Sequence, residues 1–302
     1  MSPRMNDIRN IRRAALVFAC ALPLAAVAGS DIDRKVVADP NGEVLISNVS
    51  GSIDVRGWDR NEVQVTGTIG SGVERVDVDS SGGRTVVKVV LPGRSSRDGS
   101  ADIEVQVPRN SSLDVSAVSA DVSSRGVLGT QRLTSVSGEI STDLSGNDST
   151  VKSVSGDVTV HGVGQPRSLR VSSVSGSIDV SNMGGKIEVV TVSGDARVQA
   201  SEASDVRGRT TSGNLTLHGK LTKDARVDVE GVSGDVILRL TAPGGLNADI
   251  ESFSGDIEGC LAKGVEKVGK YGPGTRLSLR TVEDGPRVRA KTLSGDIELC
   301  DK

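Results

Sequence analysis

Large aromatic side chains are nearly absent from this sequence of 302 residues, which contains one Trp, one Tyr and two Phe. A globular core of this size normally buries more of them, because each removes a large apolar area from water. Val, Ile, Leu and Ala must therefore fill the interior. This composition favours a thin core that is repeated many times over a single thick core.

Histidine is also rare. His161 and His218 each follow a strand-like stretch, in "VTVHG" and "LTLHG", and precede a glycine. No Cys or carboxylate lies at ligand spacing around either one, so we predict exposed turn residues and no metal site. Serine is abundant, but nothing marks one serine as a nucleophile beside a base. The sequence therefore predicts no catalytic residue, no metal and no cofactor.

An excess of positive charge is missing as well. The net charge at pH 7 is −3, and it falls to −6 if the four arginines and one aspartate of residues 1–28 are removed. Nucleic-acid binding needs a basic patch or stripe, and none is visible. We therefore expect no nucleic-acid partner.

The first residues, "MSPRMNDIRNIRRAALVFACALPLAAVAGS", read as a secretory leader. Four arginines precede an apolar run from Ala14 to Ala28 that ends in an A-x-A cleavage pattern. The run is shorter than the roughly 20 residues that cross a bilayer. Residues 1–28 are thus predicted to be a signal peptide, with no transmembrane segment after cleavage. The alternatives are a retained anchor and a lipoprotein modified at Cys20.

A short phrase recurs about ten times, as in "SVSGDVTV" (153–160) and "SVSGSIDV" (173–180). Between Ser119 and Ser254 the Ser of successive Ser-Gly pairs lies 18 to 21 residues from the next. Self-similarity at this period is typical of a solenoid. The residue before this Ser is Val in seven copies, and the third residue after it is apolar in all ten. The predicted core column is Ile53, Val122, Ile140, Val158, Ile178, Ala196, Leu215, Val236, Ile257 and Ile297.

Each copy alternates apolar and polar residues on both sides of the Ser-Gly pair, with many β-branched residues and no helical period. We expect two short strands per coil, with the Ser-Gly at the corner between them, where glycine tolerates backbone angles that other residues avoid. The predicted fold is all-β, a parallel β-solenoid or β-helix of roughly 18–22-residue coils, right-handed by the usual rule for parallel crossovers. Its corner glycines are Gly138, Gly156, Gly176, Gly194, Gly213, Gly234, Gly255 and Gly295.

The chain divides into the leader, an N-terminal β part (29–110) and regular repeats with a C-terminal cap (111–302). The N-terminal part begins with one full repeat, "GEVLISNVSGSIDV" (42–55), and continues with alternating stretches that lack the Ser-Gly pair. These stretches are either degenerate coils or a β-meander that covers the first edge. Some cover is needed because an open strand edge promotes aggregation.

Two polar columns accompany the repeat. Carboxylates or small polar residues stand two positions after the anchor, as at Asp157 and Asp195, and we interpret them as turn residues that accept backbone hydrogen bonds. The alternative is a calcium ladder. Ser or Thr stands two positions before the anchor in seven of the ten copies, as at Ser153 and Thr191. These hydroxyls are expected to fill the corner and bond to backbone; the alternative is a hydroxyl array that binds ice or glycan.

Two cysteines follow the presumed leader: Cys260 in "SGDIEGC" and Cys300 in "SGDIELC". In an exported protein such a pair predicts one disulfide, and the alternative is two buried free thiols. Bridged Cα atoms must lie within about 7 Å, which adjacent coils satisfy. Residues 261–287 could form one degenerate coil, but a bridge would favour an insertion that bulges out.

Aromatic platforms for a sugar cleft are restricted to Trp58 and Tyr271, far apart in sequence. Trp58, in "GWDRNEV", is interpreted as a packing plug over the first coils; the alternative is a ligand platform. Polysaccharide lyases and hydrolases also use β-helices, but this sequence is predicted not to be an enzyme.

The combination of "GWDRNEV", serial "SVSGDVTV"-type copies, "YGPGTRLSLRTV" and a final "TLSGDIEL" resembles the bacterial putative-adhesin β-repeat family, over roughly residues 36–300. That family is a domain of unknown function, related to the auto-transporter adhesin head domain class. The resemblance implies a parallel β-solenoid without established catalytic residues.

These observations predict an exported, non-enzymatic β-solenoid that serves as a scaffold or binding surface in the bacterial cell envelope, in the periplasm. Its partner would be an unknown envelope protein or glycan. One alternative is a secreted or surface adhesin that binds glycan or protein. Another is a diverged polysaccharide-active β-helix enzyme.

Overall fold

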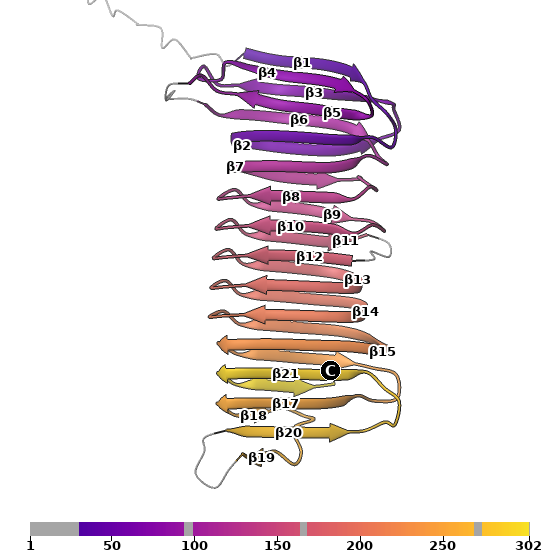
Figure 1. Cartoon of the computed structure of the whole chain (residues 1–302), viewed down its shortest axis with the longest axis vertical. Helices are drawn as coiled ribbons and strands as arrows, with labels where there is room; N and C mark the ends of the chain where they lie inside the picture. Colours follow the sequence, from indigo (N-terminus) through magenta and orange to yellow (C-terminus); the bar gives the residue numbers. More distant parts are fainter. Residues whose placement is uncertain (1–29, 94–98, 164–167, 269–273, 302) are drawn as a thin grey trace, which may run out of the picture.

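A computed structural model describes residues 30–93, 99–163, 168–268 and 274–301. The predicted signal peptide, 1–28, lies outside these residues. Every regular element described is a β-strand, and the strands stack into a long rod (Figure 1). The predicted all-β class with parallel strands is confirmed. Among the described residues, no helix has the length and apolar character needed to cross a membrane.

The strands are β1 (Ser30–Val37), β2 (Glu43–Trp58), β3 (Glu62–Ile69), β4 (Arg75–Ser81), β5 (Arg84–Val90), β6 (Ala101–Pro108), β7 (Ser112–Arg125), β8 (Gln131–Ser135), β9 (Ile140–Leu144), β10 (Ser149–Ser153), β11 (Val158–Gly162), β12 (Ser168–Ser173), β13 (Ile178–Thr191), β14 (Ala196–Thr210), β15 (Leu215–Ser233), β16 (Val236–Thr241), β17 (Asn247–Ser254), β18 (Ile257–Glu258), β19 (Glu266–Lys267), β20 (Thr275–Arg280), β21 (Arg287–Ser294) and β22 (Ile297–Cys300).

Each middle coil contributes one strand to each of two layers. The first strands pair in parallel in the order β8, β10, β12, which we call the first layer. The second strands pair in the order β9, β11, β13 and form the second layer. Ser-Gly corners join the layers on the left of Figure 1. β13, β14 and β15 run through the opposite corner, so that each supplies the second strand of one coil and the first strand of the next.

Apolar side chains of one register column lie on top of one another between the layers. Ile140, Val158 and Ile178 are neighbours in the parallel register, and each is at most 1% exposed. The same column continues in both directions along the rod, and all its members are buried. It contains Ile53, Val122, Ile140, Val158, Ile178, Ala196, Leu215, Val236, Ile297 and Ile257 in spatial order.

The N-terminal strands combine the two arrangements that the sequence left open. β5 and β6 pair in parallel with the two halves of β2 and form an outer coil. β4 pairs antiparallel with β5, and β3 and β1 continue antiparallel beyond β6. β2 therefore lies inside the rod, between the outer coil and β7.

The C-terminal end departs from the expectation that consecutive coils are neighbours. β21 lies between β15 and β17, and β22 lies between β16 and β18. β20 pairs antiparallel with β17 and, with β19, covers the outer edge (Figure 1). The last coil is thus inserted inside the end of the rod. Part of segment 261–287 forms this cap, so the segment is neither a degenerate coil nor a simple bulge.

Candidate functional site

The Ser-Gly corner brings adjacent coils into close backbone contact. A Cβ atom built on Gly156 or Gly176 would lie within 3.0 Å of the carbonyl group of the glycine one coil before it, which real side chains essentially never do. The other predicted corner glycines meet the preceding coil in the same way. Only Gly234 and Gly295 of this set have positive φ. The sequence predicted that glycine stands at the corner because it tolerates unusual backbone angles. At most copies this reason is wrong: glycine is required there because a Cβ atom has no space.

Hydroxyl groups hold several of the corners from inside. Ser153 Oγ donates to the carbonyl oxygen of Gly156 at 2.7 Å, and Thr191 Oγ1 donates to that of Gly194 at 2.9 Å. Both side chains are buried. These contacts agree with the interpretation of this column as corner residues that bond to the backbone. A buried hydroxyl has no room to present itself to ice or glycan.

The carboxylate column links one coil to the next. Asp157 Oδ1 accepts from the backbone N–H of Ser177 at 2.8 Å, and Asp195 Oδ1 accepts from that of Asn214 at 2.9 Å. The bonds thus run between coils, not within the turn that carries the side chain. Within the described part of the chain, no group of three or more His, Cys, Asp or Glu side chains is arranged to hold a metal ion.

The residue before each Ser-Gly pair points outward, and it is apolar in all but one copy. Exposed fractions run from 39% at Val49 to 59% at Phe253. We call this ladder the apolar rib, and Thr211 is its one polar rung. In spatial order its apolar members are Val49, Val118, Val136, Val154, Val174, Val192, Val232, Leu293 and Phe253.

The two flanks of the rib differ in charge. On one side lies the acidic flank, which is the outward-facing carboxylate column. It consists of Asp121, Glu139, Asp157, Asp195, Asp235, Asp296 and Asp256. A shallow groove of about 470 Å³ runs beside it over the second layer, lined among others by Asp157, Asp179 and Asp195, with Arg197 as its one basic residue.

On the other side lies the mixed flank, the outward column of the first layer next to the rib. Its charged members are Lys152, Arg209, Glu230, Lys291 and Glu251. Arg209 pairs with Glu230 at 3.2 Å and Lys291 with Glu251 at 2.7 Å, each across one coil boundary. The pKa of Glu251 is lowered because the Lys291 ammonium donates a hydrogen bond to its carboxylate. Cations and anions thus neutralise each other on this side of the rib.

Comparison with known protein families identifies the family to which the repeat belongs. Residues 75–300 match the Toastrack DUF4097 family. The chain belongs to this family. The family that the repeated phrase predicted is thereby confirmed, as a domain of unknown function.

Solved structures similar to this Toastrack chain are diverged in sequence. A "putative lipid binding protein" from Parabacteroides distasonis is 11% identical, with 90% of this chain and 97% of that chain covered and a TM-score of 0.47. A "putative adhesin" from the same organism is 12% identical, with 90% and 98% covered and a TM-score of 0.38. Another from Parabacteroides merdae is 11% identical, with 90% and 97% covered and a TM-score of 0.35. No curated protein matches the sequence.

The histidines of the Toastrack chain lie in strands and not in turns, which corrects that expectation. His161 is the fourth residue of β11 and His218 the fourth of β15, and both are exposed. The β-pairing register explains this, because each strand continues through the following glycine. His161 Nδ1 contacts Ser181 Oγ at 3.0 Å.

Trp58 closes the end of β2. Its Nε1 donates to the carbonyl oxygen of Glu62 at 2.9 Å, and the Arg60 guanidinium lies 4.8 Å from the ring centroid. The ring is half-buried and held by the turn that follows β2. Tyr271 lies outside the described residues.

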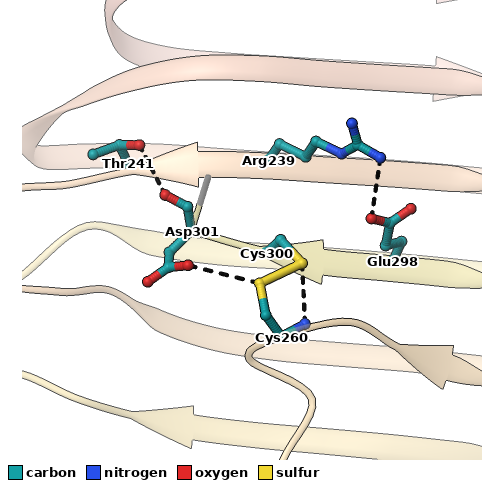
Figure 2. The surroundings of a disulfide bond; sticks show 6 residues. All are labelled: Arg239, Thr241, Cys260, Glu298, Cys300 and Asp301. Carbon is teal, nitrogen blue, oxygen red and sulfur yellow. Dashed lines mark hydrogen bonds and ion pairs between the residues drawn. A yellow bond between two sulfur atoms is a disulfide. The ribbon is translucent and has the colours of Figure 1, made fainter.

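Cys260 and Cys300 come together on the outer surface of the second layer, with Cα atoms 5.0 Å apart and their sulfur atoms in direct contact (Figure 2). Insertion of the last coil makes this possible, because it pairs β22 with β18. Nearby, Arg239 pairs with Glu298 at 3.3 Å, which links β22 to the coil on its other side (Figure 2).

Proposed function

We propose that this protein is an exported, non-enzymatic β-solenoid that serves as a scaffold or binding surface in the bacterial cell envelope. The observation that carries the proposal is the apolar rib. Soluble monomers rarely expose large contiguous apolar patches, and those that do usually bind something there. Here the exposed apolar side chains stand at the same corner of successive coils from β2 to β17.

The distribution of reactive groups supports a role without catalysis. Active sites gather groups with shifted pKa values around a cleft. In the described residues, the pKa values of Asp249 and Glu251 are lowered by hydrogen bonds from Arg280 and Lys291, which lie beside them on outer strand faces. Burial raises the pKa of Asp114, while the Arg132 guanidinium 3.7 Å away acts in the opposite direction. Each of these carboxylates thus has a basic partner, as in structural ion pairs.

We further propose the finer details of the fold. The hydrogen bonds of the acidic column join residues 18 to 21 positions apart in the middle of the rod, which supports coils of about that length. Right-handed winding remains the expectation from the general rule for parallel crossovers.

Export and location rest on the leader pattern of residues 1–28. We propose the periplasm as the compartment. The alternative is a secreted or surface adhesin, whose glycan or protein ligand would contact the same rib.

Cell fractionation with a C-terminal epitope tag tests the location. We expect the tag in the fraction released by osmotic shock, protected from protease in intact cells. Digestion in intact cells would favour the adhesin alternative, and a tag retained in the cytoplasm would overturn export.

A photoreactive amino acid at Val154 or Val192 tests the binding surface in the same cells. The matched control is Thr159, which is exposed on the second layer one strand away from Val154. We expect covalent adducts at both valine positions and few at Thr159. Equal yields at all three positions would mean that the rib is not a preferred contact.

We also propose that Cys260 and Cys300 form a disulfide in the exported protein. Their Cα separation of 5.0 Å lies within the usual range for bridged residues. The bond would tie the inserted last coil to the coil outside it.

A further inference from the structure

The rungs of the apolar rib repeat at the spacing of paired strands. Each coil supplies one rung, and parallel strands lie about 4.8 Å apart, so the ladder from Val49 to Phe253 is about 43 Å long. Side chains on one side of an extended peptide recur every 6.6 Å or so, and helix turns recur every 5.4 Å or so. Both lose register with the rib within a few rungs. A second β-solenoid keeps register along the whole length.

The flanks decide how two ribs could face each other. If two rods lay antiparallel, the two-fold axis would cross the ribs and each acidic flank would meet the other acidic flank. If the rods lay parallel, the axis would run along the ribs, and each acidic flank would meet the mixed flank of the other copy. Like charges at short distance repel, so the charges favour the parallel arrangement.

We propose that the apolar rib binds the same rib of a second copy of this chain, with the two rods parallel. This inference rests on the proposed function, because it names the partner of the binding surface. The contact is self-complementary, as in most homodimers, so that each rung meets its own equivalent. Lys152 of one copy then lies on the side of Asp157 of the other, and Lys291 on the side of Asp296.

The dimensions of the rib set the strength expected. The two layers of a β-sandwich are about 10 Å apart, so a corner about 43 Å long offers about 430 Å² from each copy. The two copies together thus bury about 860 Å², less than the 1,200–2,000 Å² or so that stable complexes bury in total. We therefore expect a dimer that dissociates in the micromolar range, which crowding on an envelope surface would populate.

Single-cysteine variants of the full chain test both the contact and its direction. Cys20, Cys260 and Cys300 are first replaced by serine, and then Val118→Cys or Val232→Cys is introduced near opposite ends of the rib. With a short bismaleimide reagent, we expect each variant to form covalent dimers with itself. Thr159→Cys, on the second layer, is the matched control and should give less than a tenth of the yield.

The outcomes separate the arrangements. In an antiparallel dimer, Val118 of one copy would lie several coils away from Val118 of the other. Only a mixture of the Val118→Cys and Val232→Cys variants would then cross-link. That result would show that the parallel arrangement is wrong. Absence of both products at 200 µM or so of protein, far above the expected dissociation constant, would overturn the dimer itself.

Sedimentation velocity of the protein with its native cysteines gives a second measurement. Val154→Glu with Val192→Glu places carboxylates on the rib, and we expect the dissociation constant to rise at least tenfold. The matched pair Thr159→Glu with Gln199→Glu adds the same charge on the second layer and should change it less than twofold. If both pairs act alike, net charge and not the rib controls association. Adducts at Val154 in cells with a different protein, together with a monomer in solution, would overturn the dimer and leave the binding surface intact.

Discussion

The backbone N–H of Asp256 donates a hydrogen bond to Oδ1 of Asp296, 2.9 Å away and 40 positions further along the chain. The N–H of Asp296 in turn donates to Oδ1 of Asp235 at 3.0 Å. The carboxylate column therefore continues without interruption through the inserted coil. The last repeat makes the same contacts as the others, although it enters the stack out of sequence order.

The corner glycines give the sharpest stability prediction. Gly156→Ala forces a methyl group against the carbonyl of Gly138, and we expect it to destabilise the protein by about 1–3 kcal/mol or more. Gly93→Ala is the control, because a Cβ there meets nothing within 4 Å. Urea denaturation followed by circular dichroism measures both. Equal midpoints for the two variants would contradict the close contact between coils.

Core and rib can be compared within one coil. Ile178→Ala removes a side chain that is 1% exposed and should cost about 2–5 kcal/mol, whereas Val174→Ala, 44% exposed, should cost well under 1 kcal/mol. The same denaturation assay applies. A similar loss in both variants would mean that the two columns are not distinguished by burial.

The acidic column should tolerate neutral acceptors. Asn214 Oδ1 accepts from the N–H of Asp235 at 2.9 Å, the same length as the bond at Asp195. We expect Asp195→Asn to retain stability and to weaken its dependence on salt, because a repelling charge is removed while the bond remains. Asp195→Ala should cost about 1 kcal/mol. Unfolding at several NaCl concentrations tests this, and equal losses in both variants would exclude the hydrogen bond as the cause.

The cysteine pair should stabilise the C-terminal end under oxidising conditions. Cys300→Ser is expected to lower the stability of that end by about 2–4 kcal/mol and to speed its cleavage by protease. Reducing agent should do the same to the unmodified protein and have no effect on the variant. A free-thiol assay that finds both sulfhydryls reactive in the exported protein would show that no bond forms.

Acid should weaken the attachment of the inserted coil. The pKa of Glu251 is lower in the folded protein than in the unfolded chain, owing to Lys291, so its contribution to stability is present at neutral pH and is lost as the pH falls through the folded pKa. We expect the stability difference between the unmodified protein and Glu251→Gln to shrink as the pH falls below about 4.3, the ordinary pKa of Glu, and to vanish once the pH is below the lowered pKa of the folded protein. A difference that persists to lower pH would assign the effect to packing. Glu251 is well exposed, so the effect is small.

The sequence predicts the structure of each repeat, but it does not predict the spatial order of repeats whose sequence patterns are the same. Ile140, Val158 and Ile178 share one pattern, which was sufficient to expect a buried column. Ile257 and Ile297 carry the same pattern, so nothing in it indicates that Ile297 lies next to Val236. The order of coils depends on the antiparallel pairing of β20 with β17, which local alternation cannot reveal.

The apolar rib was missed although the sequence contained a signal for it. Val154 stands an odd number of positions from the buried Val151, just past the end of β10, and it is exposed. When an apolar residue recurs at an outward-facing position, burial in the core cannot explain why it is apolar. The acidic flank, by contrast, was visible in the sequence as the carboxylate column. The ion pair of Lys291 with Glu251 was not, because these residues become neighbours only through the inserted coil.

The inserted last coil affects how the protein is made. A ribosome synthesises residues 287–300 after every other strand that the structure describes, yet their place lies inside the rod. A chain cut short by a premature stop codon would therefore lack the coil formed by β21 and β22. The strands on either side of that coil would have unpaired edges facing each other. Only a chain that includes β21 and β22 can close the stack.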